Sequence, residues 1–323
     1  MIVVTGAAGF IGSCLVAELN ARGRHDLILV DHLIGDNDPK KLNLAGKRYQ
    51  RYYDKAEYLK LLKRDLFDFD VQAILHMGAC SSTTLQDADY FEKNNFAYSC
   101  TVAQWALKNK ARLIYASSAA TYGDGLLGYS DDEALITRLK PLNLYGESKQ
   151  KFDVWALDQG ILAQITGLKF FNVFGPNEYH KGDMRSVVAK SYQRVAGEGK
   201  ISLFKSYRPE FKDGEQMRDF IYIKDAVDVV MFFWEHPGIN GIFNLGTGQA
   251  RSWNDLAHAL FSAVDRKANI EYMEMPESLR SRYQYFTQAQ MTKLRYAGYG
   301  KPFTCLEDAV KDYCSYLSTG RCW

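Results

Sequence analysis

The chain has 323 residues, 47% of them hydrophobic, which is enough for one large core and a smaller appended domain. Forty lysines and arginines against 38 aspartates and glutamates leave a net charge of +2, and no basic run or apolar stretch is long enough to predict nucleic acid binding or a membrane span. Because the six cysteines form no CxxC pair and the first residues do not resemble a signal peptide, we expect a cytoplasmic protein without a metal site.

A glycine-rich turn follows directly after the first predicted strand, residues 2–5. The turn has the spacing GxxGxxG, from Gly6 through Gly9 to Gly12, and runs into a helical pattern that extends to residue 19. Glycines at this place allow a tight turn, a close approach of the backbone to a pyrophosphate, and close packing of the helix on the sheet. We therefore predict a dinucleotide-binding turn.

The second predicted strand, residues 27–30, ends at Asp31. An acidic side chain at this place accepts hydrogen bonds from the ribose hydroxyls of NAD. The following segment carries Lys40, Lys41 and Lys55, however, and these cations would neutralise the ribose phosphate of NADP. From these residues alone both cofactors stay open, and so does a solvated basic loop.

A run of small and hydroxyl residues, 77–84, follows the predicted strand 73–76. Such residues at the carboxyl end of a strand leave room for a cofactor to lie across the sheet. His76, the last residue of that strand, has no acidic partner in sequence, and we interpret it as a packed side chain. The next strand, residues 112–116, ends close to Ser118, whose hydroxyl is suited to hydrogen bond to a reacting oxygen.

Tyr145 and Lys149 are spaced as YxxxK at the start of a predicted helix, after a turn at residues 141–143. Four residues are about one helical turn, so both side chains lie on one face. A nearby cation favours the phenolate and lowers the pKa of tyrosine from about 10, so that it can take a proton from a hydroxyl. The pattern also occurs on solvated helices, and its weight comes from the glycine, aspartate and serine motifs upstream.

Beyond residue 171 the pattern changes to shorter elements with longer polar loops. We therefore predict an α/β protein with a Rossmann-type doubly wound parallel sheet and a smaller C-terminal α/β substrate domain. The expected Rossmann domain covers residues 1–171 and about 219–240, and the expected substrate domain covers 172–218 and 241–323. Further helices are expected at 89–108, 186–195, 225–235 and 306–317, and one capped by Ser252 and extending to residue 264. Further strands are expected at 162–171 and 201–204, and a strand followed by a turn at 241–248.

The order of these motifs resembles the extended short-chain dehydrogenase/reductase family, which acts on nucleotide-linked sugars, and the resemblance covers essentially the whole chain. Sugar 4,6-dehydratases of this family carry an acidic pair where this chain has Ala119 and Ala120, so elimination is disfavoured. Four runs are similar to those of the ADP-L-glycero-D-manno-heptose 6-epimerase family, which makes the heptose precursor of the lipopolysaccharide core. These runs are residues 76–84, 117–123, 171–182 and 282–289.

The resemblance implies an isomerase that inverts C6 of the heptose in ADP-D-glycero-D-manno-heptose by transient oxidation to a ketone. It makes Tyr145 and Lys181 the two acid/base groups, places Ser118 beside the reacting carbon, and places Lys149 on the nicotinamide ribose. We expect tightly bound NADP, with NAD less favoured, because the family prefers NADP and the lysines near Asp31 are available for the phosphate. By the same resemblance we expect a ring-like homo-oligomer, as in a homopentamer.

The resemblance also implies two sets of contacts. The expected cofactor residues are Gly6, Gly9, Phe10, Ile11, Gly12, Asp31, His32, Lys40, Lys55, Met77, Gly78, Ala79, Cys80, Ser81, Asn94, Tyr145, Lys149, Val173 and Lys181. The expected substrate residues are Ser118, Asn172, Asp183, Lys190, Phe204, Lys205, Ser206, Tyr207, Arg218 and Tyr283.

Within the substrate set, Arg218 and Lys190 would hold the diphosphate, although an ion pair of Arg218 with Asp219 or Asp225 is an alternative. Tyr283 follows two arginines, at 280 and 282, and suits an adenine-diphosphate group. The segment 204–218 is longer than the family pattern. The chain also departs from that pattern at His32, Met77 and Asp183.

Two other functions remain open. The first is a different nucleotide-sugar epimerase or reductase on the same scaffold, distinguished by the sugar nucleotide it accepts. The second is a sensor protein that binds NADP without turnover, and the intact set of Ser118, Tyr145 and Lys149 argues against it. Reduction of the bound cofactor by a sugar substrate would distinguish an enzyme from a sensor.

Overall fold

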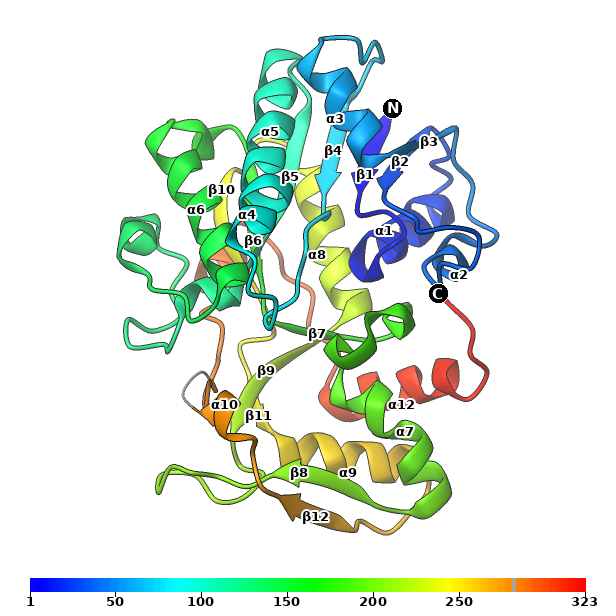
Figure 1. Cartoon of the computed structure of the whole chain (residues 1–323), viewed down its shortest axis with the longest axis vertical. Coiled ribbons are helices and arrows are strands. Elements are labelled where there is room, and N and C mark those ends of the chain that lie inside the picture. Colours follow the sequence, from blue (N-terminus) through cyan, green and yellow to red (C-terminus); the bar gives the residue numbers. More distant parts are fainter. Residues whose placement is uncertain (281–282) are drawn as a thin grey trace.

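A computed structural model describes residues 1–280 and 283–323 of the chain (Figure 1). Arg282, at the start of the last run that carries the family resemblance, lies outside the described residues. In the described part of the chain, no helix is long and apolar enough to cross a bilayer.

A seven-stranded parallel sheet forms the centre of the larger part of the molecule, with the strand order β10-β6-β5-β4-β1-β2-β3. The order reverses between β1 and β4, and in open α/β sheets a ligand crevice forms at the carboxyl ends of the strands at such a point. The strands are β1 (Ile2–Thr5), β2 (Leu27–Asp31), β3 (Arg51–Asp54), β4 (Ala73–His76), β5 (Arg112–Ser118), β6 (Thr166–Phe170) and β10 (Gly241–Leu245).

Helices cover both faces of this sheet because successive strand side chains point to opposite faces. One face, with Val3 and Ile74, packs against α3 (Lys55–Lys63), α5 (Tyr98–Lys108) and α6 (Leu144–Asp158). The other face, with Val4 and Leu75, packs against α1 (Phe10–Ala21) and α8 (Ile223–Glu235). This confirms the predicted doubly wound Rossmann-type fold.

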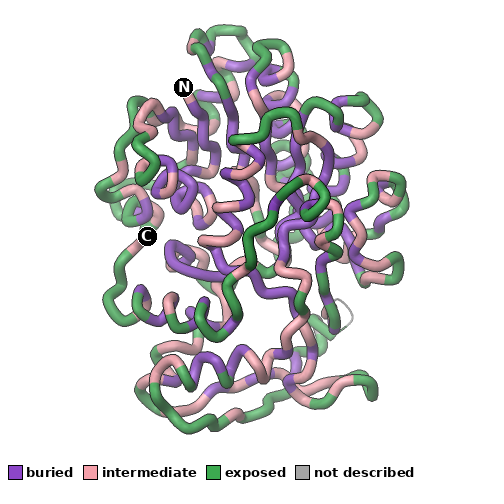
Figure 2. The backbone as a smooth tube through the Cα atoms, turned by 180° about the vertical axis from the view of Figure 1, so that it is seen from behind, coloured by how far each residue is buried: buried purple, intermediate pink, exposed green. Residues whose placement is uncertain are grey.

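The smaller part of the molecule lies below the large sheet in Figure 1. It holds a three-stranded sheet of β11 (Ala250–Ser252), β9 (Met217–Tyr222) and β7 (Asn172–Phe174), and a parallel pair of β12 (Ile270–Met273) and β8 (Ile201–Phe204). Its helices are α7 (Val187–Glu198), α9 (Trp253–Ala263), α10 (Glu277–Arg280) and α12 (Leu306–Leu317), whereas α11 (Thr292–Tyr296) packs against β10 of the large sheet. Figure 2 shows the buried backbone concentrated in the large sheet, while β12 lies at the surface.

Local signals account for several helix starts. Ser252, the predicted cap, accepts a hydrogen bond from the Asp255 amide through its hydroxyl. The Asp255 carboxylate in turn accepts a hydrogen bond from the Ser252 amide, so a capping box starts α9. Asn143 caps α6 in the same way, with its Oδ1 accepting from the Gly146 amide at 2.8 Å. The cap therefore fixes the first turn of α6, on which Tyr145 lies.

Two segments differ from the sequence predictions. The segment after Asp31, expected as a loop, contains α2 (Lys41–Leu44), β3 and α3, so Lys55 begins a helix. The helix expected at 89–108 is divided into α4 (Ala88–Phe91), a π-helical turn (Glu92–Ala97) and α5. Both depend on contacts with distant parts of the chain, since β3 is held by pairing with β2 and the π-helical turn packs against α6.

The position of β10 differs from the expected domain division. Residues 241–323 were assigned to the substrate domain, but β10 pairs with β6 along its whole length at the edge of the large sheet. Parallel pairing and complete burial make β10 part of the Rossmann core. We therefore propose that Gly241–Leu245 be counted with the first domain.

Candidate active site

One large cavity of about 1180 Å³ lies between the carboxyl ends of the large sheet and the smaller part of the molecule. All the expected cofactor residues line it, from Gly6 in the first turn to Lys181. The substrate set is divided, because Ser118, Asn172, Lys190, Arg218 and Tyr283 line the cavity and the other five members do not. The fold thus brings the glycine turn, the YxxxK helix and Arg218 to one space.

The glycine turn forms a narrow cradle at one end of this cavity. Gly6 has a φ of +66°, and a Cβ built on it would lie 2.7 Å from the Cα of Gly78. A Cβ on Gly12 would lie only 2.1 Å from the carbonyl oxygen of Gly6. Only glycine fits these places, and α1 begins directly behind them at Phe10. The cradle therefore fits the pyrophosphate of a dinucleotide at a helix N-terminus.

Asp31 lies at the end of β2, beside the cradle. Its Oδ2 accepts from the Ala8 amide at 2.8 Å, and its Oδ1 accepts from the His32 amide at 2.7 Å and from Lys40 Nζ at 2.9 Å. Lys41, the other lysine proposed for a ribose phosphate, instead pairs with Asp36 at the surface. The structure therefore selects Lys40 as the cation next to Asp31.

Ser118, Tyr145 and Lys149 meet at the carboxyl end of β5. Lys149 Nζ donates to the Ala116 carbonyl at 2.7 Å, which directs the ammonium towards the strand end. Burial lowers the pKa of Lys149 to about 8, and the charge of Asp153 opposes that shift. The ammonium is thus available at neutral pH but loses its proton well below the ordinary range of lysine.

The expectation for Tyr145 needs a correction. Burial raises the pKa of its phenol above the ordinary value, and only the neighbouring Ser118 hydroxyl lowers it. Lys149 donates its hydrogen bond to the Ala116 carbonyl and not to the Tyr145 phenol. The phenol is therefore protonated at neutral pH.

Lys181 lines the same cavity from a different element, the short helical segment Tyr179–Met184. Its ammonium lies 5.2 Å from the centre of the Phe10 ring, at the start of α1. Burial lowers the pKa of Lys181, and Glu178 opposes that shift. The lowered pKa is what an amine needs to accept a proton near neutral pH.

Arg218 and Tyr283 lie at the far end of the cavity. The Arg218 guanidinium lies 5.0 Å from the centre of the Tyr283 ring and 5.7 Å from that of Trp253. Trp253 Nε1 donates to the Tyr283 hydroxyl at 2.8 Å, which holds the two rings together. A buried cation between aromatic rings suits a nucleotide diphosphate.

The ion-pair alternative for Arg218 is wrong. The carboxylate of Asp219 accepts hydrogen bonds from Thr247 and the amides beyond it, and that of Asp225 accepts from Thr304. The Arg218 side chain donates to the Met217 carbonyl, and no carboxylate among the described residues forms an ion pair with it. Its guanidinium lines the cavity.

Five expected substrate residues lie outside the cavity lining. Lys205 Nζ donates to Glu274 Oε1 at 2.7 Å, and the Tyr207 hydroxyl donates to the same carboxylate. Phe204 ends β8 in the ladder with β12, which turns this segment towards the surface. Lys205 and Tyr207 therefore contact Glu274 here, and the roles of all five residues as substrate contacts stay predictions.

Asn95 was not selected from the sequence as a site residue. Its side chain exchanges two hydrogen bonds with the backbone of Cys80 and donates to Ser148 Oγ at 2.9 Å. It thereby ties the loop after β4 to the YxxxK helix. Its neighbour Asn94 accepts from Lys55 Nζ at 2.8 Å. The π-helical turn, a feature frequent at functional sites, separates the two side chains and was invisible in the sequence.

Comparisons with known proteins agree with this arrangement. A curated ADP-L-glycero-D-manno-heptose-6-epimerase of Nitratidesulfovibrio vulgaris (strain DP4) is 53% identical over 97% of this chain and 96% of its own. A curated protein of the same name from Fusobacterium nucleatum is 46% identical, with 98% of each chain covered. The crystal structure of the Helicobacter pylori ADP-L-glycero-D-manno-heptose-6-epimerase superposes with a TM-score of 0.81 at 27% identity, over 98% of this chain and 96% of that one.

A more distant structure shows the fold alone. The Thermus thermophilus UDP-glucose 4-epimerase complex with NAD superposes with a TM-score of 0.76 at 22% identity, with 98% of each chain covered. Residues 2–246 of this chain match the NAD dependent epimerase/dehydratase family. That match spans both the glycine cradle and the YxxxK helix, and the chain belongs to the NAD dependent epimerase/dehydratase family.

Proposed function

We propose that the protein is an isomerase that inverts C6 of the heptose in ADP-D-glycero-D-manno-heptose, giving ADP-L-glycero-D-manno-heptose for lipopolysaccharide core synthesis. The names of the relatives at 53% and 46% identity support this substrate. The observation that carries the proposal is the presence of Tyr145 and Lys181 in the lining of one cavity, together with a dinucleotide cradle and Arg218.

The bound dinucleotide would accept a hydride from the carbinol carbon and return it to the ketone. Tyr145 and Lys181 handle the matching hydroxyl proton, one for each orientation of the sugar. Because hydride is exchanged at one fixed place, inversion requires the ketone to turn and present its other face. Ser118 donates to the reacting oxygen, and Lys149 holds the ribose of the cofactor.

The residues after Ser118 favour epimerisation over elimination. Ala119 and Ala120 line the cavity, where a dehydratase needs acidic groups to remove a proton and expel water. Two methyl side chains cannot carry out either step. Residues 119 and 120 therefore provide no acid or base for elimination of water from the ketone, and re-reduction is favoured.

For the cofactor, the family is NAD(P)-dependent, and we propose NADP in this protein. Lys40 supports the proposal, since its contact with Asp31 neutralises the carboxylate that would otherwise repel a ribose phosphate. Lys55 lines the same end of the cavity.

We further propose, by analogy with the relatives, that the protein is a cytoplasmic homo-oligomer. Its substrate domain is formed mainly by residues 172–218 and 246–323.

We predict that the purified protein contains bound NADP. Denaturation should release a nucleotide with the mass of NADP, and liquid chromatography with mass detection measures it. Replacing Lys40 by methionine should weaken the retention of NADP more than that of NAD, because only NADP carries the extra phosphate. Release of NAD alone from the unaltered protein would contradict the choice of NADP.

The experiment that tests the function is incubation of the protein with ADP-D-glycero-D-manno-heptose, without added cofactor, while proton NMR follows the two C6 epimers. We expect both epimers to approach a constant ratio from either starting side, since the hydride taken from the sugar is returned to it. An unchanged epimer ratio, with nucleotide confirmed in the protein, would reject the heptose substrate. The alternative, another nucleotide sugar, would then be sought with a panel of such sugars.

A further inference from the structure

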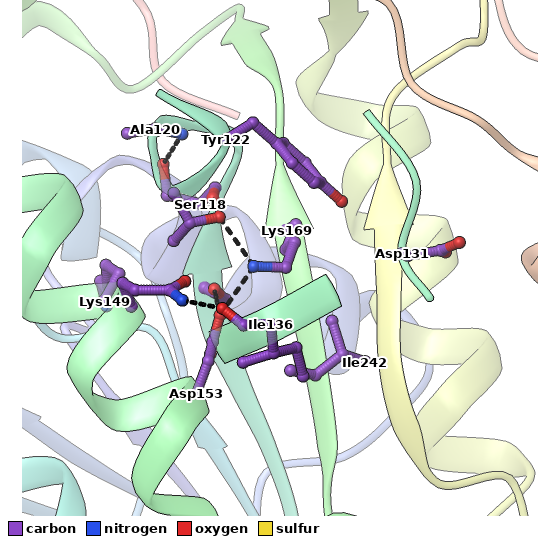
Figure 3. Close-up of polar contacts among 12 residues, drawn as sticks. Ser118, Ala120, Tyr122, Asp131, Ile136, Lys149, Asp153, Lys169 and Ile242 are labelled. Atoms are coloured by element: carbon purple, nitrogen blue, oxygen red, sulfur yellow. Dashed lines mark hydrogen bonds and ion pairs between the residues drawn. The ribbon is translucent and has the colours of Figure 1, made fainter. Parts of the chain in front are cut away.

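A fully buried ion pair lies directly behind the catalytic end of β5. Lys169 Nζ, on β6, is 2.8 Å from Asp153 Oδ2, on α6, and the two side chains are 1% and 0% exposed. Lys169 also donates to Thr121 Oγ1 at 2.7 Å. Figure 3 shows this pair beside Lys149, with Asp153 pointing up from α6 towards the strand ends.

The carboxylate of Asp153 is held by three side chains from two strands. Ser117 Oγ, next to Ser118 on β5, donates to Asp153 Oδ2 at 2.6 Å. The Tyr115 hydroxyl, also on β5, donates to Oδ1 at 3.0 Å. With Lys169 on β6, these contacts leave the carboxylate a single orientation.

Asp153 follows Lys149 by one turn of α6, so both side chains point to the same face of the helix. Other titratable groups at this place are His76 on β4, Tyr145 on α6, Tyr115 on β5, which bonds to Asp153, and the Lys169 ammonium on β6, which pairs with Asp153. Burial lowers the pKa of His76 to about 3 and raises that of both tyrosines, so all three are uncharged at neutral pH. Asp153 is thus the carboxylate that faces Lys149.

Stability alone does not account for such a pair. Removing two charges from water costs several kcal/mol for each ion, and well-packed apolar side chains of similar volume are often at least as stable. Here the pair lies next to a lysine that must keep its proton to serve the cofactor ribose. A fixed carboxylate at that place favours the ammonium over the amine.

We propose that Asp153 is a positioning residue that supplies the counter-charge of Lys149, and that Lys169 fixes the Asp153 carboxylate in the orientation this requires. Lys149 is protonated below its midpoint near pH 8 and uncharged above it. Loss of the negative charge of Asp153 destabilises the Lys149 ammonium, so the pH at which Lys149 is half protonated becomes lower. The role of Lys149 in turnover rests on the proposed function, whereas its titration does not.

The test is a direct titration of Lys149 in the purified protein labelled with [¹³Cε]lysine. The NMR signal that is missing from a Lys149→Arg variant identifies this residue. In Asp153→Asn, we expect the midpoint of Lys149 to fall by about one pH unit or more, which is a tenfold loss of ammonium relative to amine at a given pH. The high-pH limit of epimerisation should fall by the same amount.

Asp131→Asn is the matched control, because Asp131 is another buried aspartate, 6% exposed, that accepts from the Asn244 amide at 2.8 Å. Figure 3 places it well away from Lys149. Its loss should leave the midpoint of Lys149 unchanged. A fall in Asp153→Asn no larger than in this control would overturn the proposal.

Asp153→Asn leaves Lys169 without its partner, and this variant can fail to fold. The double variant Asp153→Asn, Lys169→Met removes both charges and keeps the interior neutral. Because loss of the Lys169 cation by itself raises the titration midpoint of Lys149, the double variant is compared with Lys169→Met. We expect a lower midpoint in the double variant, and equal midpoints in the two would overturn the proposal. If the unaltered protein does not act on the heptose, the titration still decides the role of Asp153, so the two failures are distinguishable.

Discussion

Replacing Tyr145 by phenylalanine is expected to reduce epimerisation by about a thousandfold, the scale of losing a positioned acid/base group. The phenol lies next to Ser118 at the end of β5, where the hydroxyl of the sugar must exchange its proton. Phenylalanine keeps the ring and its packing, so the fold and the bound nucleotide should be retained. Proton NMR of the C6 epimers measures the loss.

Tyr58→Phe is the control for this change. Tyr58 is a fully buried tyrosine of α3 that does not line the cavity, and its hydroxyl has no hydrogen-bond partner among the described residues. Its replacement should leave the rate within about twofold, since uncoupled substitutions away from the site change little. A Tyr145→Phe variant with more than a tenth of the normal rate would show that the phenol is not the acid/base group.

Lys181→Met is a companion to Tyr145→Phe. If the two groups serve the two orientations of the sugar, each variant still handles the proton in one orientation. Each would then oxidise one epimer of the substrate faster than the other, and reduction of the bound nucleotide, followed by absorbance near 340 nm, would reveal which. Equal loss for both epimers in both variants would contradict a division of labour.

Gly12→Ala is expected to weaken binding of the dinucleotide strongly. The added Cβ would lie 2.1 Å from the Gly6 carbonyl oxygen, and neither of these backbone segments can move without opening the cradle. Overpacking of this kind costs about 1–3 kcal/mol or more, and a loss of that size weakens binding by about 5- to 150-fold. The amount of nucleotide released from denatured protein, per mole of chain, measures the effect.

Gly197→Ala is the matched glycine control. Gly197 lies in α7, and a Cβ on it would meet no atom within 4 Å. Alanine is favoured over glycine inside a helix by about 1 kcal/mol, so this variant should keep its nucleotide and melt slightly higher. Full nucleotide content in Gly12→Ala would contradict the assignment of the cradle to the pyrophosphate.

Much of the fold and several site motifs could be predicted because they depend on residues close together in the chain. The strand, glycine turn and helix at residues 2–21 are such a unit, and so is the cap on α9 provided by Ser252. Tyr145 and Lys149 could be paired because helical spacing puts both on one face. These motifs also carried the family resemblance, which the comparisons confirm.

The sequence by itself therefore determined the Rossmann fold, the family and the residues at the centre of the cavity. Only the tertiary structure decided which of two lysines reaches Asp31, that Lys205 and Tyr207 contact Glu274, and that no carboxylate in the described part of the chain pairs with Arg218. Only the tertiary structure also shows that Lys169 on β6 forms an ion pair with Asp153 on α6. The physical reason is that contacts between distant segments depend on how strands and helices pack. The spacing of residues close together in the chain does not determine that packing.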